Sequence, residues 1–297
     1  MFVTGANGFV GSAVVDELVR AGHRVVGLSR SDAGAAALAA AGAEVQRGVL
    51  EDLDGLARAA RAADAVVHTA FPHDFRSLDD FAAACAVDQR AIEALGGALA
   101  GTGKALVVSS GAAASPDEQH TASPAQLAAI PRRSEPTGLA FAGRDVRAMV
   151  VRLAPTVHGV GDHGMVARFI AGARSSGFAT YVGDGANRWC AAHRLDVARL
   201  YRLALEAGTS GARYHGVAER GVPFRAIAEA IARHLGVPAR SRSLEEAVAD
   251  FGFVGRVMAM DGPSSSAWTQ AQLGWRPEGP GLLEDLDVGH YFSAPAA

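Results

Sequence analysis

The chain has 297 residues, of which 49% are hydrophobic, and a formal net charge of −3. This length and composition suffice for one large α/β unit or two joined ones, and the interspersed charges exclude the basic surface that nucleic-acid binding requires. No apolar run reaches the roughly 18 residues of a membrane span, and Met1 does not begin a signal peptide, so we expect a cytoplasmic protein without membrane contact.

Short apolar runs alternate with amphipathic helical stretches along the first half of the chain. The expected strands cover residues 2–3, 24–28, 44–46, 65–68, 105–109 and 146–153, and the expected helices cover 11–21, 35–41 and 81–99. This alternation is typical of strand-helix-strand units around a parallel sheet. Because such crossovers are right-handed, we predict an α/β fold, a doubly wound parallel sheet of Rossmann type that binds ligands at the carboxyl ends of its strands.

After about residue 153 the pattern changes to glycine-rich loops, with helices at 165–173, 197–206 and 224–235 and one strand, 212–217, that returns to the sheet. The expected domains are a dinucleotide-binding unit, residues 1–155 with a returning segment at about 188–220, and a smaller C-terminal substrate-binding cap, residues 156–187 and 221–297. The stretch 112–131 is rich in Ala, Ser, Pro and Gln and is expected to form a loop at the ligand edge.

The segment TGANGFVG, residues 4–11, follows a strand and opens a helix. In that context Gly5 permits a tight turn, Gly8 lets the backbone approach a pyrophosphate, and Gly11 allows close packing of helix on sheet. The N-terminus of the helix then offers N–H groups and a partial positive charge to the phosphates. The alternative is a helix start that merely uses glycine. The spacing favours dinucleotide binding.

Ser29, Arg30 and Ser31 stand at the end of the second strand, where a carboxylate would bind the ribose 2′-hydroxyl of NAD and a cation would accommodate the 2′-phosphate of NADP. An arginine fork and two hydroxyls favour NADP (NADPH) as the cofactor, although Asp32 follows directly. The alternative is a solvated surface arginine. The residues expected to bind the cofactor are Gly5, Asn7, Gly8, Phe9, Val10, Gly11, Ser29, Arg30, Ser31, Leu50, Ala70, Phe71, Ser109 and Pro155.

Further segments accompany the glycine turn: DAVVHTA (64–70), VVSS (107–110), VRLAPTVHG (151–159), HRLDVA (193–198) and LGWRP (273–277). Together they cover nearly the whole chain and resemble the extended short-chain dehydrogenase/reductase family, to which NAD-dependent epimerase/dehydratase proteins also belong. The resemblance implies a cofactor-binding sheet roofed by a small substrate domain. It also implies two long helices, here 81–99 and 134–142, that pair across a two-fold axis, so a homodimer is expected if their faces carry an apolar stripe.

The chain departs from this family at the catalytic pair. Family enzymes use Tyr-x-x-x-Lys, but the single lysine, Lys104, follows Ala100 at that spacing and starts the fifth strand. The region where the pair should lie, residues 130–136, contains two prolines, so we expect a helix capped by Ser134, with Arg132 and Arg133 as the nearest cations.

Two further family positions also differ. Ser110 is the nearest substitute for the family's catalytic hydroxyl, because Gly111 occupies its usual place, and Val49 replaces an adenine-binding acid. The chain is therefore identified as an atypical member of the family.

Three histidines are expected near the ligand edge, and histidine exchanges protons near neutral pH. His73 lies in the segment FPHDF, which should pass over the nicotinamide, with a locally hydrogen-bonded loop histidine as the alternative. His158 is expected to be structural or, second, catalytic, and His68 is expected to be a core histidine. Arg152 is expected to be structural, and His193 with Asp196 to hold a loop on the cap. Cys85 and Cys190 are expected to be buried thiols, and no metal site is predicted.

Two classes of function follow. The first is an NADP(H)-dependent oxidoreductase that transfers a hydride to or from a small organic carbonyl, imine or alcohol, with a proton donor other than Tyr/Lys. The catalytic candidates are His73, Ser110, His158, Arg132 and Arg133. The second is a cofactor-binding sensor or regulatory protein with little turnover. An epimerase or isomerase that returns the hydride to its substrate is a third reading.

Overall fold

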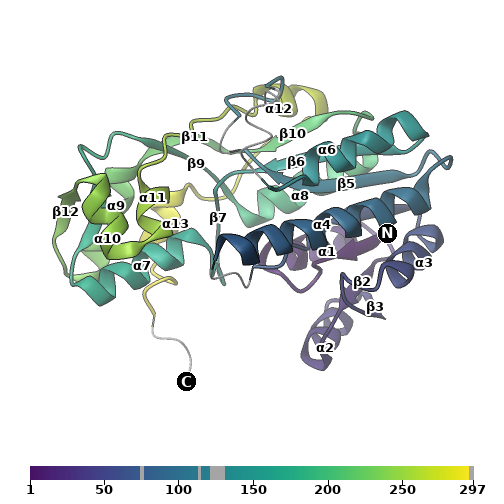
Figure 1. The fold of residues 1–297 in the computed structure, drawn as a ribbon, viewed down its shortest axis with the longest axis horizontal. Helices are drawn as coiled ribbons and strands as arrows, with labels where there is room; N and C mark the ends of the chain where they lie inside the picture. The colour runs from purple at the N-terminus through teal and green to yellow at the C-terminus, as the bar shows by residue number, and fades with distance from the viewer. Residues whose placement is uncertain (74–76, 113–114, 121–130, 294–297) are drawn as a thin grey trace.

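Seven strands form the central sheet of the protein, whose computed structural model describes residues 1–73, 77–112, 115–120 and 131–293 (Figure 1). Their order is β10 (Arg213–Gly216), β6 (Arg147–Leu153), β5 (Ala105–Gly111), β4 (Ala65–His68), β1 (Phe2–Thr4), β2 (Val26–Ser29) and β3 (Glu44–Arg47). Every pairing between neighbours is parallel. The predicted doubly wound α/β fold is confirmed, and the order reverses between β1 and β4, where such folds bind ligands.

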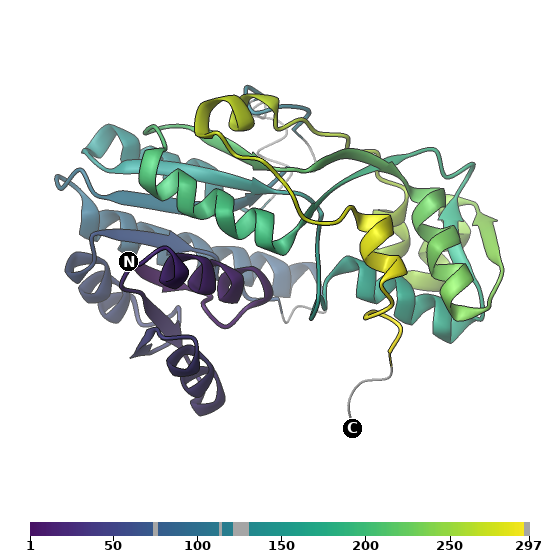
Figure 2. The same cartoon turned by 180° about the vertical axis from the view of Figure 1, so that it is seen from behind.

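Helices cover both faces of this sheet, as a buried parallel sheet requires. One face carries α1 (Phe9–Arg20), α2 (Asp32–Ala40) and α8 (Arg194–Ala207), which pack on Val3, Val67 and Val107. The other carries α3 (Leu53–Ala62), α4 (Leu78–Leu99) and α6 (Ser134–Leu139) with the short 3₁₀ helix η1 (Ala140–Arg144). Figure 1 looks onto α4 and Figure 2 onto α8 and α1.

A smaller unit lies beyond the carboxyl edge of the sheet (Figures 1 and 2). It contains β7 (Thr156–His158), β9 (Arg188–His193) and β11 (Glu219–Pro223) in one sheet and β8 (Ala179–Val182) with β12 (Ala239–Arg242) in another. Its helices are α7 (Met165–Ser176), α9 (Phe224–Leu235), α10 (Leu244–Phe251), α11 (Phe253–Met258) and α13 (Leu282–Asp287). Phe169, Trp189 and Phe224 meet edge to face at its centre, with ring centroids 5.1 to 5.5 Å apart.

Two segments differ from the domain bounds expected from sequence. The returning segment consists of α8 and β10, whereas β9 pairs with β7 and β11 in the cap. Within 221–297, α12 (Ala267–Leu273) packs beside α8 and β10, and the fully buried Trp275 joins the core of the sheet unit. An apolar run looks the same in either sheet, so only the pairing partners decide where it belongs.

Local differences are also found around α6. The predicted helix 134–142 is divided into α6 and η1, and Arg133, not Ser134, is the capping residue. The Ser134 hydroxyl instead donates to Asp88 Oδ2 at 2.5 Å, a partner 46 residues away. The helix α3, capped by Asp52, separates β3 from β4, as the predicted strand-helix-strand alternation requires, although no bounds were predicted for it. Among the described residues, no helix is both long and apolar enough to cross a membrane.

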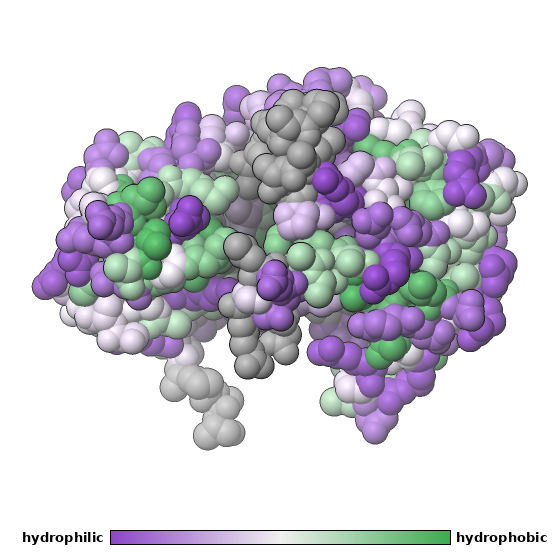
Figure 3. Space-filling model, viewed as in Figure 1, coloured by the Kyte–Doolittle hydropathy of each residue, from purple (hydrophilic) through white to green (hydrophobic). Residues whose placement is uncertain are grey.

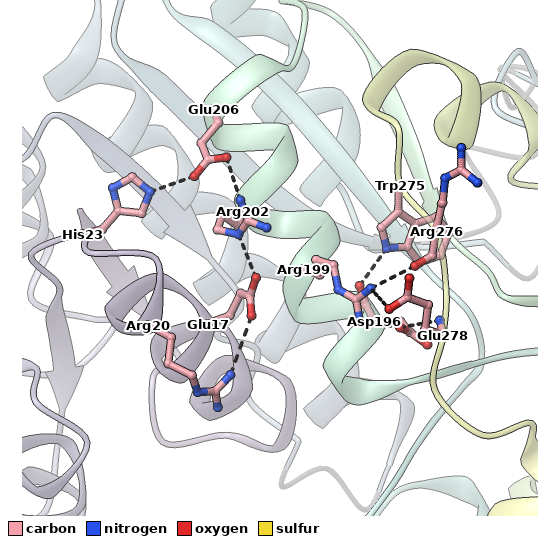
Figure 4. A network of polar contacts seen from close by, with 10 residues as sticks. All are labelled: Glu17, Arg20, His23, Asp196, Arg199, Arg202, Glu206, Trp275, Arg276 and Glu278. Carbon is pink, nitrogen blue, oxygen red and sulfur yellow. Dashed lines mark hydrogen bonds and ion pairs between the residues drawn. The ribbon is translucent and has the colours of Figure 1, made fainter.

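Polar contacts join α8 to α1 and to the C-terminal segment (Figure 4). Arg202 Nε donates to Glu17 at 2.7 Å, and Glu206 lies 3.0 Å from His23 Nε2. At the other end of α8 the buried Asp196 carboxylate accepts hydrogen bonds from the backbone N–H groups of Glu278 and Gly279, both at 2.9 Å. Asp196 therefore holds the loop after Trp275 against α8, as part of its predicted role, whereas the Nδ1 of His193, predicted to act with it, has no hydrogen-bond partner in the part of the chain that the structure describes.

We expect Asp196→Ala to lower the free energy of unfolding by about 1–3 kcal/mol, because two part-buried backbone N–H groups and the Arg199 guanidinium lose their acceptor. Urea denaturation followed by circular dichroism measures this loss. Asp54→Ala, an exposed acid in the first turn of α3, is the matched control and should cost less than about 1 kcal/mol. Equal losses in the two variants would contradict the assignment.

Candidate functional site

The glycine turn between β1 and α1 lies at the point where the strand order reverses. Gly5 has a φ of 68°, and a Cβ atom there would come within 2.5 Å of Ala70 N. A Cβ atom on Gly11 would lie 2.0 Å from Gly5 O, so only glycine, which has no side chain, lets α1 pack this closely against the turn. The N-terminus of α1 has no side-chain cap. Its N–H groups are therefore available to an anion, and the cradle fits a pyrophosphate.

Side chains from distant segments surround this turn. Asn7 Nδ2 donates to Gly34 O at 2.8 Å and joins the turn to α2. The Arg194 guanidinium lies 4.6 Å from the Phe9 ring centroid and donates to Ser12 Oγ and Val160 O, both at 2.9 Å. Val10 is half-buried against the core. Sequence reasoning missed Arg194, because its distance of 182 positions from Ser12 leaves no local signal.

The segment after β2 presents fewer hydroxyl groups than expected. Ser29 is buried and its Oγ donates to Ser31 O at 3.1 Å, so its hydroxyl hydrogen is already used inside the segment, and its contact with the 2′-phosphate stays a prediction. Ser31 caps α2 by accepting from Gly34 N at 3.1 Å, and its own O–H remains able to donate outward. Arg30 is exposed. A second cation, Arg47, reaches the same segment from the end of β3 and contacts Asp32 at 2.7 Å.

The nicotinamide end of the predicted site is formed by the ends of β4 and β5. Ser109 is buried, and its hydroxyl donates to His68 O and pairs with Tyr201, both at 2.7 Å. Its hydroxyl is therefore hydrogen-bonded within the core, and its contact with the cofactor stays a prediction. Ser110 points to the opposite face of the sheet, because side chains alternate along a strand. That face carries α6, since Val108, two residues earlier, packs against Gly138.

Leu50 and Pro155, the two remaining predicted contacts, are half-buried in the loops after β3 and β6. Leu50 packs against the core beneath α3. Val49 is 44% exposed, so the position of the family's adenine-binding acid does face outward.

A chain of hydrogen bonds connects the glycine turn to Arg132. Thr4 Oγ1 bonds His68 Nδ1 at 2.7 Å, and His68 Nε2 bonds Asp88 Oδ1 at 3.0 Å. Asp88 Oδ2 accepts from the Ser134 hydroxyl, whose Oγ accepts from Arg132 Nε at 2.8 Å. All members but Arg132 are buried. His68 is thus the predicted core histidine, and the chain fixes the position of Arg132.

Arg132 brings a positive charge beside Phe71 and His73. Its guanidinium carbon lies 4.3 Å from the Phe71 ring centroid, and His73 meets the same ring edge to face at 5.4 Å. Partial burial and, second, the charge of Arg132 lower the pKa of His73, and His163 and Arg168 of the cap act in the same direction. Burial and the neighbouring charges thus favour the neutral imidazole of His73.

The other catalytic candidates lie elsewhere. Arg133 lines a groove between α4 and α6 with Gln89 and Glu93, on the outer side of these helices. His158 is fully buried in the cap, where its Nδ1 pairs with Asp285 at 2.9 Å. Of the predicted candidates, the structure therefore brings Arg132 and His73 together and leaves Arg133 and His158 apart from them.

Arg152 and Lys104 both form polar contacts within the fold. Arg152 is buried and paired with Glu135 at 2.6 Å. Lys104 Nζ donates to Arg61 O and Ala63 O at the end of α3, near the amino ends of the strands. Cys85 and Cys190 are free and buried, as predicted. No group of three or more metal-binding side chains occurs within the described part of the chain.

The comparisons with known proteins agree with this architecture. The model of the NAD dependent epimerase/dehydratase family matches residues 1–217. The chain is 45% identical over 296 residues to "Uncharacterized protein C2A9.02" of Schizosaccharomyces pombe, with 98% of this chain and 99% of that protein covered. It is 40% identical over 299 residues to "Uncharacterized protein YLL056C" of Saccharomyces cerevisiae, with 98% of each covered.

A solved structure shares the fold. The UDP-glucose 4-epimerase of Thermus thermophilus, in complex with NAD, superposes with a TM-score of 0.71 at 22% identity, and the match covers 99% of both chains. The match of the family model over most of the chain, together with the glycine turn at the reversal of strand order, shows that the protein belongs to the NAD dependent epimerase/dehydratase family.

Proposed function

We propose that the protein is an NADP(H)-dependent oxidoreductase that transfers a hydride to or from a small organic carbonyl, imine or alcohol. The observation that supports this most is one continuous edge of the sheet with the Gly5–Gly11 cradle in the middle. Arg30 follows β2 on one side of the cradle, and His73, beside Arg132, follows β4 on the other side. Family membership supports a nicotinamide dinucleotide in this cradle, and so does the structural similarity to an epimerase that was solved as a complex with NAD.

When bound, the nicotinamide cofactor supplies the hydride chemistry, so the residues of this chain bind, orient and handle protons. The N-terminus of α1 holds the pyrophosphate. Arg132, fixed through Ser134 and Asp88, provides a permanent positive charge that polarises the substrate oxygen. His73 exchanges the proton with that oxygen, and its neutral imidazole is suited to act as the base in alcohol oxidation.

A protein with little turnover is the second candidate. It is favoured by the state of three of the four tyrosines: Tyr201 and Tyr214 are buried with their hydroxyls hydrogen-bonded, and burial strongly raises the pKa of Tyr201. Tyr291 donates to Asp162 at 2.7 Å. Incubation of the purified protein with NADPH and a panel of ketones and imines, followed by the loss of NADPH absorbance, separates the two candidates. A third reading, epimerisation, predicts substrate interconversion with no net change in NADPH.

Cofactor selection gives the first test of this proposal. Arg30→Ala is expected to weaken NADPH binding by about 1–3 kcal/mol, the range for loss of charge-assisted hydrogen bonds, and to leave NADH binding nearly unchanged. Fluorescence titration with each cofactor measures both constants. An equal loss for the two cofactors would show that Arg30 does not recognise the 2′-phosphate.

We also propose a homodimer formed through α4 and α6. The outward positions of α4 are small or charged, namely Ala82, Ala83, Ala86, Arg90, Glu93 and Gly97, so the expected apolar stripe is narrow. Figure 3 accordingly shows light-green and purple residues interspersed where α4 runs. Small residues nevertheless permit close approach of two helices. Light scattering at micromolar concentration should give twice the chain mass of 30.5 kDa, and Ala86→Arg should reduce it to the monomer. A monomeric wild type would refute the dimer.

A further inference from the structure

The cofactor edge carries a second arginine that sequence reasoning did not single out. Arg47 ends β3 and reaches across to the segment after β2, where it donates to Asp32 Oδ1 at 2.7 Å and to the Ser31 carbonyl oxygen. The backbone supports this approach, because Gly48 N donates to Ser29 O at 3.1 Å. Arg47 therefore contacts Ser31, the residue directly after Arg30, from the end of the neighbouring strand.

Arg47 affects the charge of this segment because it pairs with the Asp32 carboxylate. Its side chain projects fully into solvent beside Ser31, and Arg47 is its hydrogen-bond partner. An unpaired carboxylate at the end of β2 would accept the ribose 2′-hydroxyl of NAD and repel the 2′-phosphate of NADP. With Arg47 paired to it, the local charge of the segment from Arg30 to Asp32 becomes positive.

Arg47 has N–H donors that are not used within the described part of the protein and can bind a phosphate. A guanidinium has five N–H donors, and the contacts to Ser31 and Asp32 use two of them. Half of the side chain remains exposed, so the other donors can reach a ligand at this edge. The arrangement offers a planar fork beside Arg30, the geometry that binds phosphate oxygens in pairs.

We propose that Arg47 determines cofactor specificity, by binding the 2′-phosphate together with Arg30 and by holding Asp32 away from the ribose. This rests on the proposed NADP(H) dependence. The alternative is an ordinary surface ion pair. Such pairs contribute little to stability, so substitutions here are expected to leave the fold intact and binding can be measured directly.

The experiment measures dissociation constants for NADPH, NADH, 2′,5′-ADP and 5′-AMP by calorimetric titration. The two adenosine ligands differ only in the 2′-phosphate, and their binding requires no turnover. The variants are Arg47→Gln, Asp32→Asn and the double variant. Arg24→Gln is the matched control, because Arg24 forms a comparable exposed pair with Glu44 at the opposite, amino edge of β2 and β3.

We expect Arg47→Gln to weaken binding of NADPH and 2′,5′-ADP about 10-fold or more, with little change for NADH and 5′-AMP. Asp32→Asn should tighten NADPH binding by a few fold. Asp32→Asn should also restore part of the NADPH affinity lost in Arg47→Gln, because it removes the exposed negative charge. Arg24→Gln should change none of these constants.

Two results separate this inference from the proposed function. If the wild type binds NADH as tightly as NADPH, the proposed cofactor preference is refuted, and the proposed role of Arg47 in that preference is refuted as well. If the wild type prefers NADPH but Arg47→Gln keeps the same preference, or loses no more affinity than Arg24→Gln, the role of Arg47 is overturned while the proposed function stands.

Discussion

Replacement of Gly11 by alanine is expected to reduce dinucleotide affinity by about 100-fold or more. A Cβ atom at this position would lie 2.0 Å from Gly5 O and 2.7 Å from Thr69 Oγ1, and the first of these is backbone that cannot rotate away. Either α1 or the Gly5 turn must therefore move, and the N–H groups lose their alignment toward the pyrophosphate. Titration with NADPH gives the affinity, and thermal denaturation gives the accompanying loss of stability.

Gly97→Ala is the matched control for this change. Gly97 lies in α4, is exposed, and a Cβ atom there would meet nothing within 4 Å. Gly97 lies near the C-terminal end of α4, on the proposed dimer face and outside the cradle, so this variant is expected to leave cofactor affinity unchanged. A Gly11→Ala protein that binds NADPH as tightly as Gly97→Ala would show that the cradle is not the cofactor site.

His73→Gln is expected to lower kcat by about 100-fold or more while cofactor affinity stays within a few fold, because general acid–base catalysis contributes about 10²–10⁴. Glutamine keeps the size and polarity of the side chain but cannot exchange the proton. Steady-state kinetics with an active ketone or alcohol measures the change. His158→Gln is the comparison. It breaks the buried pair with Asp285, so it should lower the free energy of unfolding while changing kcat much less than His73→Gln does.

The pH dependence follows from the sign of the His73 shift. Burial and the charge of Arg132 lower the pKa of His73, so it lies below the ordinary value of 6.5. Oxidation needs the neutral imidazole, and its kcat/KM should be constant above that pKa and fall as the pH drops through it. Reduction needs the imidazolium, and its kcat/KM should rise as the pH falls from 8 toward 6 by about 10-fold per unit. A His73→Gln enzyme that retains this profile would exclude His73 as the titrating group.

In the candidate catalytic region, the sequence identified two candidate cations, Arg132 and Arg133, but could not decide between them. The prolines at 131 and 136 predict a helix that begins only at about Ser134, and α6 does begin there; both Arg132 and Arg133 were candidates. The choice between them depends on Asp88 and Ser134, which direct Arg132 toward Phe71, while Arg133 lies in the groove between α4 and α6. Asp88 lies 46 residues from Ser134 in the chain, so the sequence around Arg132 and Arg133 gives no sign of which arginine this contact would fix.

What the sequence by itself determined is the fold and the position of the cofactor cradle. Alternating apolar runs and helical stretches predict the parallel sheet, and the Gly5, Gly8 and Gly11 spacing predicts the turn, because backbone freedom and periodicity are local properties. The tertiary structure decided which hydroxyls remain accessible at Ser29 and Ser109, and which distant cations, Arg47 and Arg194, reach the cofactor edge. Those contacts follow from strand order and register, which place residues far apart in the chain within hydrogen-bonding distance.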